Sequence, residues 1–151
     1  MVISHKYRFI FIKTIKTAGT SIEVFLSQCC GEDDVFTPIQ PPVPPHVPRN
    51  HEGFFNHMPA HQIRDKVPRE VWDDYLKFCV ERNPWDKTLS HFFMRRERTG
   101  GTLTFDEYLA AGTVPVSYPL YTDEARSTIL VDRVLRYERL VEELGGVFGK
   151  L

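Results

Sequence analysis

The sequence lacks the features that mark secreted and membrane-spanning proteins. It has three cysteines in 151 residues, Cys29, Cys30 and Cys79, an odd number that includes an adjacent pair. We therefore expect reduced thiols packed as small apolar groups, not a disulfide framework. The longest apolar run near the start, residues 9–12, is far shorter than a signal-peptide core or a membrane span. These absences predict a cytoplasmic protein with no membrane span.

The chain also lacks an excess of charge of either sign. Its 19 lysines and arginines face 20 aspartates and glutamates, which gives a formal net charge of -1 and a pI near 6.6. Broad binding to nucleic acid or to an anionic membrane needs clustered positive charge, so neither partner is expected. A single small anionic ligand remains compatible with this balance. The length and a hydrophobic content of 42% predict one globular domain, residues 1–151.

Segments with strand and helix character alternate along the chain. Residues 7–13 are rich in β-branched and aromatic side chains, which is typical of a strand buried on both faces. Two more strands are expected at 75–81 and 129–137. Helical spacing, caps or first-turn prolines predict helices at 20–27, 59–67, 68–74, from residue 84 onward, at 104–112 and at 138–144. We predict an α/β layered fold with a mainly parallel sheet flanked by helices.

Capping residues predict where several helices begin and end. A threonine or serine near residue 20 would cap the first helix, and Asn83–Pro84 supplies an N-cap followed by a first-turn proline. Thr104–Glu107 has the form of a capping box, and Gly112 can end that helix. Gly145–Gly146 would close the last helix. The helix after Pro84 is expected to have one apolar face, made of Trp85, Leu89, Phe92 and Phe93.

A proline-rich segment occupies about residues 37–50 and holds six of the eleven prolines. Proline removes a hydrogen-bond donor and fixes the backbone, so we expect a stiff, extended surface loop. A recognition motif for a partner module is the alternative.

The first motif with chemical meaning is Lys16-Thr-Ala-Gly-Thr-Ser21, between a predicted strand and a predicted helix. A glycine turn there would direct backbone N–H groups at one point, and the helix N-terminus and Lys16 add positive charge. The order differs from a nucleoside-triphosphate loop, in which the lysine follows the second glycine. The next strand ends Val-Glu-Arg82 without a metal-holding aspartate, which disfavours a magnesium-dependent kinase or GTPase. A solvated lysine in an ordinary turn is the alternative interpretation.

The second motif is Arg82-Asn-Pro-Trp-Asp-Lys-Thr-Leu-Ser90, at the carboxyl end of a predicted strand. Ligands of parallel α/β sheets bind beyond this edge, so Arg82 would lie near the Lys16 loop. A guanidinium can hold a phosphate through two parallel hydrogen bonds, and the Ser90 hydroxyl can add a third. An ion pair for Arg82 and an ordinary helical position for Ser90 are the alternatives.

Together the two motifs resemble the sulfotransferase superfamily, and more closely its branch of bacterial and carbohydrate enzymes. Weaker likenesses at 105–109 and 134–140 extend the match over most of residues 7–144. The resemblance implies a P-loop NTPase-like sulfotransferase fold, in a compact or truncated version because many members continue beyond the last matched strand. Lys87 stands where the family usually has arginine, which keeps the charge but loses the fork geometry.

The resemblance also implies a function and a set of site residues. The function is transfer of a sulfuryl group from 3′-phosphoadenosine-5′-phosphosulfate (PAPS) to a hydroxyl or amine of a small-molecule or carbohydrate acceptor, without a metal. Lys16 would be catalytic and would stabilise the leaving phosphate. The 5′ end of the donor would bind Lys16, Thr17, Ala18, Gly19, Thr20 and Ser21, and the 3′-phosphate would bind Arg82 and Ser90.

A general base completes the expected site. Histidine titrates nearest neutral pH, and related enzymes often place one between the two motifs, just before a helix, as in Asn56-His57-Met-Pro-Ala. His57 is therefore the expected base, and His61 is the nearest alternative.

Two rival functions remain. His57 and His61 are spaced like zinc ligands, but the segment lacks a glutamate after the first histidine and contains a proline. The other rival is a catalytically degenerate domain that binds PAPS or its product and does not turn it over.

Overall fold

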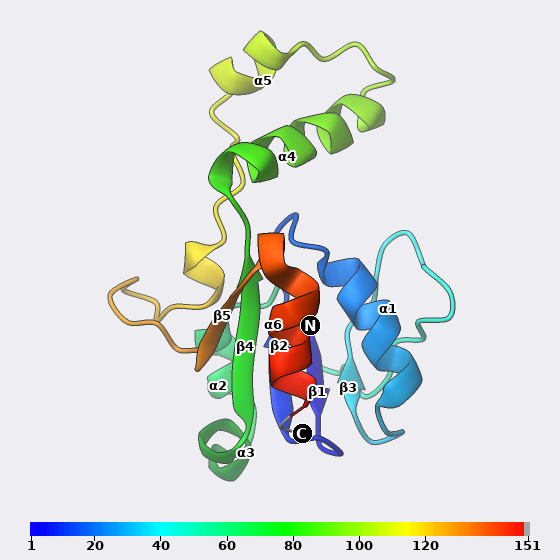
Figure 1. Ribbon diagram of the computed structural model, residues 1–151, viewed down its shortest axis with the longest axis vertical. Helices are drawn as coiled ribbons and strands as arrows, with labels where there is room; N and C mark the ends of the chain where they lie inside the picture. Colours follow the sequence, from blue (N-terminus) through cyan, green and yellow to red (C-terminus); the bar gives the residue numbers. More distant parts are fainter. Residues whose placement is uncertain (150–151) are drawn as a thin grey trace.

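The computed structural model describes residues 1–149 and has an α/β architecture (Figure 1). The strands are β1 (Val2–Ser4), β2 (Phe9–Ile12), β3 (Val35–Phe36), β4 (Leu76–Glu81) and β5 (Arg133–Arg136). The helices are α1 (Gly19–Cys29), α2 (Ala60–Arg64), α3 (Arg69–Asp74), α4 (Pro84–Arg98), α5 (Phe105–Ala110) and α6 (Leu140–Phe148), with 3-10 turns η1 (Tyr118–Leu120) and η2 (Tyr137–Arg139). None of the described helices is long and apolar enough to cross a membrane.

The five strands form one mixed sheet in the order β3-β1-β2-β4-β5. β2 pairs with β4 and β4 pairs with β5 in parallel, whereas β1 pairs with β2 and β3 antiparallel. The prediction of an α/β fold is confirmed, but the mainly parallel sheet is wrong, because two of the four pairings are antiparallel. The sequence expectation missed β1 and β3, which are only three and two residues long.

Side chains of β2 alternate between two hydrophobic clusters, one on each face of the sheet. Ile10 and Ile12 pack in a cluster with residues of α2, while Phe9 and Phe11 pack with residues of α1 and α6. All four of these side chains are at most 1% exposed. The strand is therefore buried on both faces, as expected, although it is shorter than the predicted range 7–13.

Several predicted helix ends are confirmed, and the predicted end of the last helix is wrong. The Asn83 side chain caps α4 by accepting a hydrogen bond from the Trp85 amide, and Thr104 and Glu107 form the full capping box of α5. Gly112 follows α5 with φ +63°. The last helix, however, continues to Phe148 and is not closed by its two glycines. We attribute this to the buried contacts of Val147, which lies in the core beyond them.

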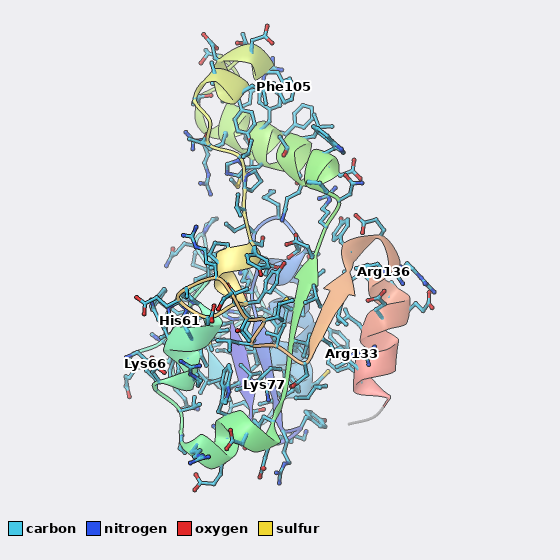
Figure 2. The ribbon with its side chains drawn as sticks, turned by 90° about the vertical axis from the view of Figure 1, so that its left-hand side faces the viewer. His61, Lys66, Lys77, Phe105, Arg133 and Arg136 are labelled. Carbon is cyan, nitrogen blue, oxygen red and sulfur yellow. The ribbon has the colours of Figure 1, made fainter. Side chains whose placement is uncertain are left out.

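α4 and α5 form an arm that projects beyond the sheet (Figure 1). α5 folds back on α4 through aromatic contacts among Phe92, Phe105 and Tyr108, and Figure 2 labels Phe105 at this junction. The expected apolar face of α4 is largely wrong, because Phe92 alone of its four members is buried. Trp85 is 78% exposed and Phe93 60% exposed. α5 covers Phe92, and Lys87 is buried in the first turns of α4, but the side that carries Trp85 and Phe93 stays exposed.

The cysteines are all free, as expected, but they do not share one environment. Cys79 is buried in the core, whereas Cys29 at the end of α1 is exposed. The expectation that all three pack as small apolar groups is therefore wrong for Cys29.

Candidate functional site: an anion-binding cavity at the sheet edge

The carboxyl ends of β2, β4 and β5 meet at one edge of the sheet and open into a cavity of about 710 Å³. The two motifs lie on this edge, as the sequence predicted. The cavity is lined by residues 13–16 and 18–21, by Ile39, Gln40, Asn56 and His57, by Arg82 and Tyr137, and by Ser90, His91, Met94 and Arg98 of α4. All the expected site residues except Thr17 line it.

The loop after β2 presents backbone amides to the cavity. Lys16 and Ala18 have φ values of +59° and +60°, in the left-handed region that non-glycine residues seldom adopt. Ala18 occupies the N-cap of α1 without a side-chain hydrogen bond, so the expected Thr or Ser cap is wrong. The first helical bond runs from the Ile22 amide to the Ala18 carbonyl, 3.0 Å. The three amides of residues 19–21 precede it and are left free to bind an anion.

Thr17 supports this loop from below. Its side chain is buried, lies 2.8 Å from the Thr14 hydroxyl and donates a hydrogen bond to the Thr14 carbonyl. The Thr14 hydroxyl in turn donates to the carbonyl of Val80 in β4. Thr17 was expected among the donor-binding residues, but the structure turns its hydroxyl toward the sheet, away from the cavity.

A buried lysine fixes the start of α1. Lys13 donates to the Glu23 carboxylate at 2.5 Å, and both side chains are almost completely buried. The aliphatic part of Lys13 passes so close to Gly19 that a Cβ there would lie 2.6 Å from the Lys13 Cγ. Glycine is therefore required at position 19 for this close approach.

Arg82 enters the cavity from the end of β4 with unused hydrogen-bonding capacity. Its guanidinium carbon lies 4.2 Å from the centre of the Tyr137 ring, and its Nη1 donates a long 3.4 Å bond to the Lys16 carbonyl. Its Nε is buried and has no hydrogen-bond partner among the described residues. Nε is closed to solvent, but the rest of the guanidinium lines the cavity and, apart from the long Nη1 bond, has N–H groups that an anion could use.

An ionic network behind Arg82 links the second motif to the first. Lys87, itself buried, forms an ion pair with the partly buried Glu81, whose carboxylate also accepts from the Arg82 amide at 2.9 Å. Lys87 also contacts the Ser117 hydroxyl at 3.2 Å, and that hydroxyl accepts from the Ile15 amide. Lys87 therefore holds the two loops together and does not line the cavity.

His57 lines the cavity in a defined orientation. Its Nδ1 lies 3.0 Å from the Lys13 carbonyl, an acceptor, so this nitrogen carries the proton and Nε2 is left unprotonated. Burial lowers the pKa of His57 below its usual value, and the Lys13 charge lowers it further. A neutral imidazole with a free Nε2 can accept a proton at neutral pH.

His61, the alternative base, lies outside the cavity lining. It belongs to α2, which begins after His57 with Pro59 at its N-cap, and Figure 2 labels it on that helix beside the sheet. The two histidines therefore do not share a helical face as zinc ligands would. Among residues 1–149, no group of three or more His, Cys, Asp or Glu side chains is placed to hold a metal ion.

The cavity is positively charged. Four of its lining residues are lysine or arginine, and none of the described lining residues is acidic. Burial lowers the pKa of Lys16, and the charges of Arg82 and Arg98 lower it further. Since these cations disfavour one another, an anionic ligand between them would be stabilised.

Sequence reasoning missed several lining residues. Tyr137 was matched only as part of a strand, and Ile39 and Gln40 were placed in a surface loop. His91 follows Ser90 directly and contacts the Tyr108 hydroxyl at 2.9 Å. Spacing along α4 could have found Met94 and Arg98, which follow Ser90 at intervals of four and therefore share its helical face.

The structure thus defines an α/β protein with a cationic cavity at the carboxyl edge of its sheet. No protein-family model matches the chain. An uncharacterized protein of Archaeoglobus fulgidus is 36% identical over 98 residues, which span 62% of this chain and 82% of that protein. The chain belongs to the same family as this archaeal protein.

Proposed function

We propose that the protein is a sulfotransferase that moves the sulfuryl group of PAPS to a hydroxyl or amine acceptor. The observation that carries this proposal is one cavity that unites free helix N-terminal amides, Lys16, an under-bonded Arg82, Ser90 and an oriented histidine, with no acidic residue in its described lining. The resemblance of the two motifs to the sulfotransferase superfamily leads us to propose a P-loop NTPase-like sulfotransferase fold, compact in this chain.

The two anions of the donor would bind at separate places. The amides of Gly19, Thr20 and Ser21 and the Lys16 ammonium would hold the 5′ end, where a left-handed loop already directs them. Arg82 and the Ser90 hydroxyl would hold the 3′-phosphate. Tyr137 keeps the Arg82 guanidinium in place through its ring.

Transfer would form a bond between the acceptor oxygen and sulfur as the bond from sulfur to the bridging phosphate oxygen breaks. Negative charge then grows on the phosphate, where Lys16 and the loop amides stabilise it. The acceptor proton would pass to Nε2 of His57, whose Nδ1 proton is held by the Lys13 carbonyl. In this proposal, residues of this chain would bind the leaving phosphate and take up the acceptor proton.

Two measurements test the proposal. Calorimetry with 3′-phosphoadenosine-5′-phosphate should show binding, and the same nucleotide without its 3′-phosphate should bind more weakly. Labelled PAPS with a panel of acceptors should then show transfer. Binding without transfer would favour the degenerate nucleotide-binding domain, and no binding of the 3′-phosphorylated nucleotide would refute the function.

A further inference from the structure

The cavity contains a third cationic centre beyond the two that a donor nucleotide would occupy. Arg98 lines the cavity and forms no ion pair with any of the residues 1–149. Lys13, by contrast, is neutralised by Glu23. Three uncompensated cations therefore face the cavity, namely Lys16, Arg82 and Arg98.

Helix geometry separates Arg98 from the 3′-phosphate position. Ser90, Met94 and Arg98 follow one another at intervals of four on α4, and all three line the cavity. At 1.5 Å per residue, Arg98 begins about 12 Å beyond Ser90 along the axis. Helical side chains lean back toward the N-terminus, so Arg98 reaches toward the level of Met94. A phosphate bound by Ser90 and Arg82 would lie about a turn away.

Arg98 also acts electrostatically on the first loop. Its charge contributes to the lowered pKa of Lys16 across the cavity, which places the guanidinium within electrostatic range of the loop that would bind the 5′ end. It also contributes to the lowered pKa of His91 on the same helix.

A second residue of the described cavity lining also has an unpaired polar atom. Asn56 lines the cavity next to His57, and its Oδ1 is buried without a hydrogen-bond partner in the described chain. An amide oxygen in this position needs a donor, such as a ligand hydroxyl.

We propose that Arg98 selects the acceptor: it binds a carboxylate, sulfate or phosphate group that the acceptor itself carries, while Asn56 accepts a hydrogen bond from an acceptor hydroxyl. The acceptor is therefore a hydroxylated acid and not a neutral phenol or lipid. This inference rests on the proposed transfer function.

The test uses two glycosides that differ in one charged group, 4-nitrophenyl glucuronide and 4-nitrophenyl glucoside. Each is titrated into protein saturated with 3′-phosphoadenosine-5′-phosphate, so that both donor centres are filled. The glucuronide should bind about 10- to 100-fold more tightly, as expected for a charge-assisted contact. Arg98→Gln should remove this preference and Arg98→Lys should restore part of it, with nucleotide affinity unchanged in both variants.

Arg95→Gln is the matched control, because Arg95 is exposed on the same helix, carries the same charge and lies outside the cavity lining. It should keep the preference for the glucuronide. Equal binding of the two glycosides, or no binding of either, would overturn the inference. So would an Arg98→Gln variant that loses nucleotide affinity, since Arg98 would then be a donor ligand. Failure of the wild type to bind the nucleotide is a separate result, which refutes the proposed function itself.

Discussion

The two loops that leave the sheet edge, residues 13–21 and 81–90, are built differently. The first offers mainly backbone to the cavity, because its side chains at Thr14 and Thr17 are hydrogen-bonded beneath it. The second offers two side chains, Arg82 just before the Asn83 cap of α4 and Ser90 on that helix.

Both loops nevertheless contain the same two kinds of residue. Each contains residues that hold the loop and residues that face the ligand. Hydroxyl contacts and the buried Lys13–Glu23 ion pair hold the first, and a partly buried ion pair between Glu81 and Lys87 holds the second. Substitutions can therefore separate loss of the scaffold from loss of the ligand contacts.

The largest effect is expected at His57, which the first loop orients and the second does not contact. His57→Ala should lower turnover about 10²–10⁴-fold, while nucleotide binding and the thermal midpoint stay near wild type. His61→Ala is the control and should be close to normal. If turnover falls strongly in His61→Ala and stays normal in His57→Ala, the general base is His61.

The same residue predicts a pH dependence. The base must be neutral to act, and burial lowers the pKa of His57 below its usual value of 6.5. The rate should therefore hold through neutral pH and fall only as the pH drops through this lowered pKa. An acid limb at or above pH 6.5 would contradict the assignment.

Lys16 is the cationic ligand contact of the first loop, as Arg82 is of the second. Lys16→Ala should lower turnover at saturating donor about 10²–10³-fold, because the charge matters most as the leaving oxygen becomes negative. Nucleotide binding should change much less. If only the affinity falls, Lys16 is a ground-state phosphate ligand.

Removal of the ion pair should have the largest effect on stability. Lys87→Met leaves the Glu81 carboxylate without its cation and should cost about 3 kcal/mol of the free energy of unfolding. Denaturant unfolding measures this loss. Lys87→Arg, the residue usual in the resembled family, is the control, and a Lys87→Met protein as stable as wild type would mean that the pair does not hold the loops.

Arg82→Ala should weaken the 3′-phosphorylated nucleotide by about 1.5–3 kcal/mol and hardly affect the analogue that lacks this phosphate. Calorimetry with both nucleotides measures the difference. Equal losses for the two would place the 3′-phosphate elsewhere.

The smallest effect is expected at the scaffold of the first loop. Thr17→Val keeps the shape of the side chain but removes the hydroxyl that bonds to Thr14, at a cost of about 1 kcal/mol in unfolding free energy. Nucleotide affinity should remain close to wild type. If the free energy of nucleotide binding falls by more than the free energy of unfolding, the Thr17 hydroxyl contacts the ligand.

The sequence predicted those parts of the fold and site that depend on local signals. Asn83 with Pro84, the Thr104 capping box and the buried β2 follow from short-range chemistry, and all are confirmed. The two motifs also fall on one edge as expected, because β2 and β4 are parallel neighbours.

The rest depends on contacts between distant residues. The short strands β1 and β3 exist only through pairing, β1 with β2 and β3 with β1, so their own sequences do not mark them. The direction in which Thr17 points is decided by Thr14 and the neighbouring strand. Arg98 enters the cavity only because the α4–α5 arm stands over the sheet edge.

The proline-rich segment, expected to be a surface loop, also supplies part of the cavity wall through Ile39 and Gln40. Each proline restricts its own backbone and that of the preceding residue. Ordering the backbone of a flexible residue costs about 1–2 kcal/mol of conformational free energy. In this segment most of that cost is met when the chain folds, before a ligand binds. The wall is therefore preorganised, and ligand affinity need not be spent on closing a mobile flap over the site.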